Sequence, residues 1–235
     1  ILNKDGKIVA YKKVGNNLEA IPLNLIQNDN GLLSYTEITN DRATLIITDT
    51  TLTKKDSIIN QKTVWNTPFF KILANGNYLM VKHEQEYIDL SEKIPNSEPN
   101  TLVVYSDIYE LDKNKNIVFY WRALDYLNIE DSYNTINYNY NPPQYNFNRI
   151  TGIEQDATGN ILVSQANLSE ISKIDKKTGD FIWRLGGKNN QFKFINEKEE
   201  NSPVYFSYQN DITQLLNGNI TLFDNGFQHT EQVSR

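Results

Sequence analysis

Short polar turns followed at once by apolar runs recur along this chain. They occupy residues 75–81, 158–163 and 217–222, and each opens with Asn-Gly-Asn or Thr-Gly-Asn before Tyr or Ile. Glycine takes a positive φ in tight turns without steric cost, and β-branched or aromatic residues favour strands. The pattern therefore predicts a turn and then a strand at each place. No segment keeps a 3.6-residue apolar period, so helices should be short and lie in insertions.

A second repeat predicts β-hairpins with aromatic ends. Residues 108–121 and 171–183 each contain an apolar strand, a polar turn and a strand that ends on tryptophan. Together the two repeats describe one antiparallel meander, which is complete over residues 156–187. Meanders repeated every ~40–60 residues are typical of β-propeller blades. We therefore expect an all-β propeller in which Trp121 and Trp183 pack in the core between blades.

The uneven spacing of the turns predicts insertions between the strands. Residues 128–148 are rich in Asn and Tyr, residues 188–203 are charged, and about four to five blades fit in the chain. Loops of this length often carry function, although decoration of one propeller face is the plainer interpretation. The first insertion could offer a stacking surface for a ligand or a protein interface. Its tyrosines are Tyr133, Tyr138, Tyr140 and Tyr145.

Composition narrows the class of function. The 235 residues include 14 Tyr, 10 Phe and 3 Trp, which suits sheets, and 39% are hydrophobic, which is enough for a core. A net charge of −6 argues against a nucleic-acid partner. The lack of cysteine removes disulfides, thiolate nucleophiles and cysteine zinc sites. No apolar run approaches the ~20 residues of a membrane span.

Four motifs follow one another in the last third of the chain. They are Trp-Arg-Leu-Gly-Gly-Lys at 183–188, Gln-Asn-Asp at 209–211, Ile-Thr-Leu-Phe-Asp-Asn-Gly at 220–226 and Ser-Arg at 234–235. The residues of these motifs and the order of the motifs along the chain resemble the arylsulfotransferase family, specifically its PAPS-independent enzymes. The resemblance covers roughly residues 30–235 and implies a six-bladed β-propeller with a substrate pocket in its central funnel. It also implies an exported or extracellular protein, and a single domain over residues 1–235 that is incomplete at one or both ends.

The polar catalytic positions of that family are changed in this chain. In the family, a histidine accepts the sulfuryl group, and other pocket positions are histidine or arginine. The matching residues here are Pro68, Tyr126, Arg149, Ala166 and Asn210. An amide nitrogen is delocalised into its carbonyl, so Asn210 cannot replace a histidine nucleophile. The resemblance therefore predicts the fold while the residues argue against the family's reaction.

The favoured function is a binding or scaffolding module without a cofactor or metal, for a small anionic or aromatic ligand or another protein. Arg149 stands where the family has a pocket histidine, and an arginine there can bind an anion such as a sulfate ester. A salt bridge or a funnel-lining role is the alternative for this residue. The ligand-binding candidates are Arg149, Tyr126, Gln209, Asn210 and His229.

The alternative function is an active aryl sulfotransferase or sulfatase with a rearranged site. In that case Arg149, Tyr126 and His229 would converge on the sulfate group. We interpret the other histidine, His83, as an ordinary histidine at the end of a strand. The spacing of the acids that follow it matches no metal-ligand pattern, so we interpret them as exposed side chains. They are Glu84, Glu86 and Asp89.

Overall fold

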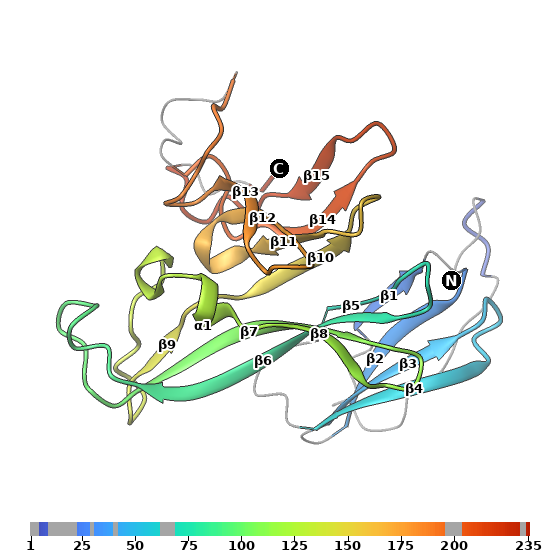
Figure 1. Cartoon of the computed structure of the whole chain (residues 1–235), viewed down its shortest axis with the longest axis horizontal. Coiled ribbons are helices and arrows are strands. Elements are labelled where there is room, and N and C mark those ends of the chain that lie inside the picture. The colour runs from blue at the N-terminus through green and yellow to red at the C-terminus, as the bar shows by residue number, and fades with distance from the viewer. Residues whose placement is uncertain are drawn as a thin grey trace.

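The structure, a computed structural model, is nearly all β. It describes residues 5–8, 23–28, 31–39, 42–61, 69–195, 204–230 and 234–235. Pro68, one of the substituted catalytic positions, lies outside these ranges. Among the described residues, four antiparallel strands pair in chain order in each of three sheets, the second of which has one further, parallel strand, and a two-stranded sheet follows them. Figure 1 shows the sheets following one another along the chain, from blue to red.

The strands divide among the sheets as follows. The first sheet contains β1 (Leu23–Gln27), β2 (Leu33–Thr39), β3 (Arg42–Thr48) and β4 (Lys54–Gln61). The second contains β5 (Phe70–Ile72), β6 (Tyr78–Ile88), β7 (Thr101–Leu111) and β8 (Ile117–Trp121). The third contains β10 (Ile150–Gln155), β11 (Ile161–Gln165), β12 (Glu170–Ile174) and β13 (Phe181–Gly186). The fourth contains β14 (Asn210–Gln214) and β15 (Ile220–Phe223).

The predicted turn-and-strand repeats are confirmed, because β6, β11 and β15 each begin two residues after the turn glycine. Gly159 and Gly218 have φ values of +86° and +85°, which an L side chain rarely adopts. In the middle copy, the carboxylate of Asp156 accepts the backbone N–H groups of Thr158 at 2.8 Å and Asn160 at 3.0 Å. The side chain of Asp156 therefore stabilises the turn that follows it by accepting backbone hydrogen bonds.

Apolar side chains fill the space between consecutive sheets. The cluster between the first and second sheets includes Leu45, Ile47, Ile58, Phe70 and Met80. The cluster between the second and third includes Val81, Ile108, Trp121, Phe147 and Ile161. The cluster between the third and fourth includes Leu162, Ile171, Phe206 and Ile212. Each meander is thus buried on a face that meets the next meander, as blades of a propeller are.

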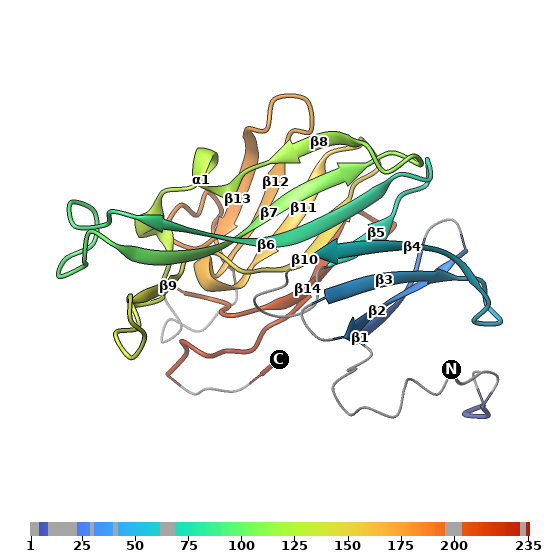
Figure 2. The ribbon, with the colours of Figure 1, turned by 90° about the horizontal axis from the view of Figure 1, so that it is seen from below.

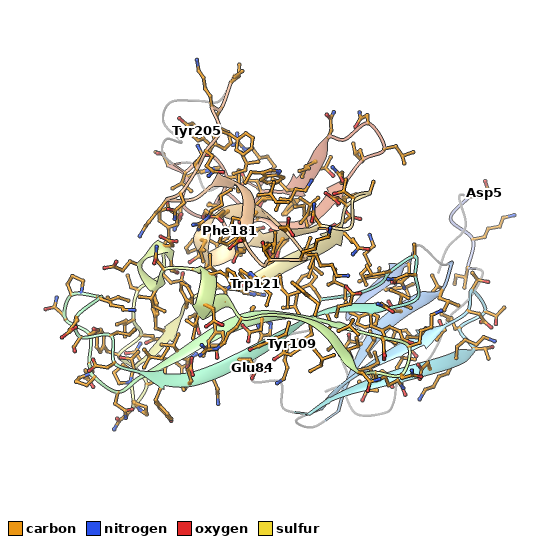
Figure 3. All side chains as sticks on the ribbon, in the orientation of Figure 1. Asp5, Glu84, Tyr109, Trp121, Phe181 and Tyr205 are labelled. Carbon is orange, nitrogen blue, oxygen red and sulfur yellow. The ribbon has the colours of Figure 1, made fainter. Side chains whose placement is uncertain are left out.

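The two hairpin tryptophans differ in burial. Trp121 is fully buried, its Nε1–H donates to the carbonyl of Gly179 at 3.0 Å, and its ring meets the edge of Phe181 at 6.0 Å. Both contacts cross to the third sheet, and Figure 3 shows Trp121 and Phe181 in the space between the sheets. Trp183 is only partly buried, against Phe192. The core role predicted for both residues is complete only for Trp121.

The first insertion links the second and third sheets. It contains α1 (Ala123–Tyr126), the 3-10 turn η1 (Ile129–Asp131) and β9 (Gln144–Asn146), which pairs in parallel with β7. These elements are short, as predicted, and no described helix has the length and apolar character to cross a membrane. Tyr145 is 2% exposed and donates its hydroxyl to the carbonyl of Ile129. A recognition surface made by all four tyrosines is therefore wrong, because Tyr145 fills the core.

The first strands of the four sheets line one central cavity, so the fold is propeller-like. Residues of β1, β5, β10 and β14 all contribute to its walls. Figure 2, seen from below, shows β5, β10 and β14 near the middle of the molecule. A central channel lined by the first strand of each sheet is a feature of β-propellers. The six-bladed arylsulfotransferase type and the single domain over residues 1–235 stay predictions.

Candidate ligand-binding cavity

Arg149 stands where the chain passes from β9 in the second sheet to β10 in the third. The N–H of Phe147 donates to the carbonyl of Val104 at 2.9 Å, and the N–H of Ala166 donates to the carbonyl of Arg149 at 2.8 Å. The backbone is therefore held from both neighbouring sheets. The side chain is exposed and makes no ion pair or hydrogen bond with any residue that the structure describes. An unpaired guanidinium thus faces the centre of the fold.

His83 lies beside this arginine and was not among the predicted ligand-binding residues. It is on β6, on the same side as its cross-strand partner Ser106, whose hydroxyl lies 2.8 Å from His83 Nδ1. Burial and, to a lesser extent, the positive charge of Arg149 lower the pKa of His83 to about 4. The ring is therefore neutral at pH 7. The strand alternation that buries Val81 could have indicated that His83 also points inward.

The tautomer of His83 depends on whether the Ser106 hydroxyl donates to Nδ1 or to the Asn148 carbonyl. Its oxygen accepts the N–H of Ile150 at 3.2 Å and lies 3.4 Å from the carbonyl of Asn148, farther than from Nδ1. We assign the hydroxyl hydrogen to the shorter contact, with Nδ1. His83 is then protonated on Nε2 and offers a neutral donor beside the guanidinium of Arg149.

Asparagines surround Arg149 on one side. A cavity of about 230 Å³ is lined by His83, Val104, Asn134, Asn146, Asn148, Arg149, Asn167 and Tyr208. The carbonyl of Asn146 accepts the side-chain amides of Asn134 at 2.8 Å and Asn167 at 2.9 Å. Tyr208 donates its hydroxyl to the Asn134 side chain. The walls are therefore fixed by hydrogen bonds among neutral polar groups.

A second cavity, of about 680 Å³, opens on the other side of Arg149 and is the central cavity of the fold. Much of its wall is apolar, from Phe69, Phe70, Ile150, Ile153 and Ile212. Lys71 and Glu154 form an ion pair in this wall, and Asp211 adds a carboxylate. Both cavities are lined by His83 and Arg149, so they meet at this pair.

Buried polar side chains that are linked by hydrogen bonds support the loop that carries Arg149. The side-chain oxygen of Asn148 accepts the N–H of Ser106 at 2.6 Å, and its amide donates to Gln165 at 3.1 Å. Gln165 in turn donates to Ser172 at 3.2 Å, and Ser172 donates to Glu170. Because each group is satisfied, the network holds the loop in one conformation.

The network ends on a buried ion pair in the Trp-Arg-Leu-Gly-Gly motif. Arg184 contacts both carboxylate oxygens of Glu170 at 2.8 Å and also Asp131 at 3.2 Å. A Cβ on Gly186 would lie 2.6 Å from the carbonyl of Ser169, so only glycine fits there. The motif therefore has a structural explanation that needs no ligand.

The Phe-Asp-Asn-Gly and Ser-Arg motifs also meet each other. Asp224 and Arg235 exchange two backbone hydrogen bonds of 2.8 Å, and Arg235 Nε donates to Asp224 at 3.0 Å. The other carboxylate oxygen of Asp224 accepts the N–H groups of Ser207 and Gly226. These motifs thus tie the segments around the fourth sheet together.

Three predicted residues lie at or near the two cavities. Asn210 lines it as the first residue of β14. Gln209 is fully buried, and its amide donates to the carbonyl of Glu170 at 2.9 Å. Ala166 is buried at the start of the 3-10 turn η2 (Ala166–Leu168), next to Asn167 of the first cavity. The structure thus brings Arg149 and Asn210 to one cavity, with Gln209 buried beside it.

Two predicted residues line neither cavity. Tyr126 stacks on Trp121 at 5.4 Å, donates its hydroxyl to the carbonyl of Thr178 at 3.2 Å, and lines a separate cavity beneath α1. His229 is buried, with Nδ1 3.9 Å from a carboxylate oxygen of Asp224. Neither residue shares a cavity with Arg149, so the structure does not assemble the rearranged site expected from them.

Two of the three acids near His83 take part in ion pairs, while Asp89 accepts hydrogen bonds from Ser91. Glu84 pairs with Lys82, and Glu86 pairs with Arg122 at 2.5 Å. Strand alternation places Lys82, Glu84 and Glu86 on the opposite face of β6 from His83. Among the described residues, no group of three or more His, Asp or Glu side chains could hold a metal ion.

Comparisons with known proteins give no family. No protein-family model matches the sequence, and no curated protein matches it. Among solved structures, a protein of unknown function from Bacteroides caccae is similar at 13% identity and a TM-score of 0.49, over 95% of this chain and 60% of that chain. A catalytically inactive virginiamycin B lyase from Staphylococcus aureus with quinupristin is similar at 13% identity and a TM-score of 0.44, over 94% and 56%.

A second structure of that lyase, with selenomethionine, is similar at 13% identity and a TM-score of 0.42, over 95% of this chain and 61% of that chain. This chain therefore spans 56–61% of the length of these three structures. At these scores the similarity supports no argument about function. The resemblance to arylsulfotransferases stays a prediction.

We expect His83 to titrate with a pKa of about 4, against the ordinary 6.5, in a histidine NMR experiment. In Arg149→Gln the pKa should rise, because the neighbouring positive charge is removed. The unfolded chain takes up this proton near pH 6.5 and the native protein only near pH 4, so stability should fall as pH is lowered between these values. His229→Asn assigns the signals. A native pKa at or above 6.5 would contradict a ring that its surroundings keep neutral at pH 7.

Proposed function

We propose that this protein is an arylsulfotransferase-like β-propeller that binds a small anionic ligand at Arg149 and does not carry out the family's sulfuryl transfer. The observation that carries the proposal is the unpaired guanidinium of Arg149 where the two cavities meet. An arginine offers two parallel N–H donors to a carboxylate, sulfate or phosphate. By the same resemblance, we propose that the protein is exported.

The surroundings of Arg149 favour an anion over a cation. His83 is neutral at pH 7, and in the tautomer protonated on Nε2 it offers a further donor. The Glu154 carboxylate in the second cavity is already paired with Lys71. A bound anion therefore gains hydrogen bonds at Arg149 without competing with a carboxylate that already pairs with it.

The first test is binding of 4-nitrophenyl sulfate, followed by isothermal titration calorimetry. Loss of a charged hydrogen-bond partner costs about 1.5–3 kcal/mol, so Arg149→Gln should weaken binding about 10- to 150-fold. Lys177→Gln removes the same charge from an exposed turn, and should leave the affinity within about twofold. Equal affinity in the wild type and Arg149→Gln would overturn the proposal.

A second function is favoured by the position of His83. If Nδ1–H donates to Ser106, Nε2 is an unprotonated nitrogen beside the cation that would hold a sulfate. In that case Nε2 attacks the sulfur, the bond from sulfur to the phenolic oxygen breaks, and the phenolate leaves. A phenol acceptor then takes the sulfuryl group from the histidine and loses its proton to solvent.

The tautomer of His83 separates the two functions. Nitrogen NMR at pH 7 should find Nε2 protonated in a binding module and Nδ1 protonated in a transferase. In parallel, 4-nitrophenyl sulfate and a phenol are incubated with the protein, and 4-nitrophenolate is measured by absorbance. Release that disappears in His83→Ala supports the transferase, and no release together with Arg149-dependent binding supports the binding module.

A further inference from the structure

The two cavities that meet at Arg149 differ in chemistry. The smaller one is lined chiefly by side-chain amides and a phenol, while the wall of the larger one is about half apolar and half polar, its apolar part including Phe69, Ile153 and Ile212. Arg149 is the unpaired cation between them among the described residues. A ligand with its charge at Arg149 can therefore place one part in the smaller cavity and another against the apolar part of the larger cavity's wall.

The smaller cavity contains polar side-chain groups that are available to hydrogen-bond a ligand. The side-chain oxygen of Asn167 and the side-chain amide of Asn146 make no hydrogen bond with other described residues. Asn134 and Tyr208 are engaged with each other and form a fixed wall. Paired amide donors and acceptors of this kind match hydroxyl groups, each of which donates and accepts. The volume of about 230 Å³ limits the occupant to a small group.

The apolar part of the larger cavity's wall suits an uncharged apolar group. Phe69, Ile153 and Ile212 line it, and burial of an apolar surface against them is favourable. Asp211 adds a carboxylate to this wall, which would repel a second negative charge. The charge of the ligand is thus directed to Arg149 and its apolar part to the side of Phe69.

We infer that the ligand is a hydroxylated ring with one carboxylate and an apolar substituent, the chemistry of an aryl glucuronide. The carboxylate binds Arg149, the hydroxyl groups occupy the cavity of Asn146 and Asn167, and the aryl group lies along the apolar wall of the second cavity. The inference rests on the proposed anion binding at Arg149 and specifies what is attached to the anion.

The test is a calorimetric comparison of four compounds on the wild-type protein. 4-Nitrophenyl β-D-glucuronide carries all three parts. The glucoside of 4-nitrophenol lacks the carboxylate, 4-nitrophenyl sulfate lacks the sugar ring, and glucuronate lacks the aryl group. The glucuronide should bind at least about tenfold more tightly than each of the other three, since each lacks one set of contacts.

Two variants separate this inference from the proposed function. Asn146→Ala should weaken binding of the glucuronide about fivefold or more and leave 4-nitrophenyl sulfate within about twofold. Asn139→Ala changes an exposed asparagine of the same insertion that lines neither cavity, and should change neither affinity. Thermal unfolding of both variants checks that they fold.

The outcomes are distinguishable. If 4-nitrophenyl sulfate binds through Arg149 but the glucuronide binds no more tightly, the sugar inference is overturned and the proposed function stands. If neither anion binds, or Arg149→Gln changes neither affinity, the proposed function and the inference both fall. If the glucuronide binds tightest but Asn146→Ala has no effect, the placement of the sugar is overturned.

Discussion

Replacement of Arg184 by alanine should lower the free energy of unfolding by about 3–5 kcal/mol. The change leaves Glu170, which is fully buried, without the guanidinium that contacts both its oxygens. Burial already raises the pKa of Glu170, so its charge is costly even with the partner in place. Asp131 loses a contact of 3.2 Å at the same time. Urea unfolding followed by tryptophan fluorescence measures the change.

The matched comparison is Arg122→Ala. Arg122 also contacts two acids, Glu86 and Asp125, but on the surface, where such pairs contribute about 0–1 kcal/mol. In the Arg184→Ala background, Glu170→Gln should recover part of the loss because the uncompensated charge is removed. Equal losses of stability in the Arg184 and Arg122 variants would show that the buried ion pair contributes no more to the free energy of unfolding than the surface pairs, which would contradict this prediction.

Replacement of Trp121 by alanine should cost about 3–5 kcal/mol, the range for a large aromatic side chain removed from a core. The indole is fully buried between the second and third sheets and donates to the carbonyl of Gly179. The change opens a cavity between two meanders and removes the only hydrogen bond that this ring can donate. Chemical unfolding followed by circular dichroism measures it.

Trp183 provides the comparison for this second variant, because it ends the equivalent hairpin of the next meander. Its ring is only partly buried, so Trp183→Ala should cost less than half as much as Trp121→Ala. Trp121→Phe keeps most of the apolar surface and should fall between them. A larger loss at Trp183 than at Trp121 would show that the third and fourth sheets, and not the second and third, depend most on this position.

The repeated elements could be predicted because local rules determine them. An Asn-Gly or Thr-Gly turn followed by β-branched or aromatic residues forms the same hairpin wherever it occurs, and β6, β11 and β15 begin where this pattern places them. The position of Trp121 in the core followed from the same repeat. These features depend on neighbours in sequence, which a single sequence contains.

The site could be predicted only in part because it depends on contacts between distant segments. Arg149 was found from its place in a motif, but His83 comes from another sheet, and its role follows from the contact with Ser106. Tyr126 and His229 occupy plausible motif positions, yet they pack against Trp121 and Asp224. Spacing along the chain does not reveal which side chains meet at the centre.

The motifs that resemble an enzyme family have structural explanations in this chain. Arg184 holds Glu170, and Asp224 holds Arg235, without a ligand. Selection for the fold alone is enough to account for such residues. The functional argument therefore depends on Arg149 and its two cavities, where an exposed cation has no structural partner among the described residues.

The central claim is tested most directly by a crystal structure of the protein with 4-nitrophenyl sulfate. The account predicts the sulfate at Arg149, with a sulfate oxygen about 2.7–2.9 Å from a guanidinium nitrogen and the nitrophenyl ring between Phe69 and Ile212. Sulfate bound elsewhere, or a guanidinium that turns away to pair with a protein carboxylate, would contradict it.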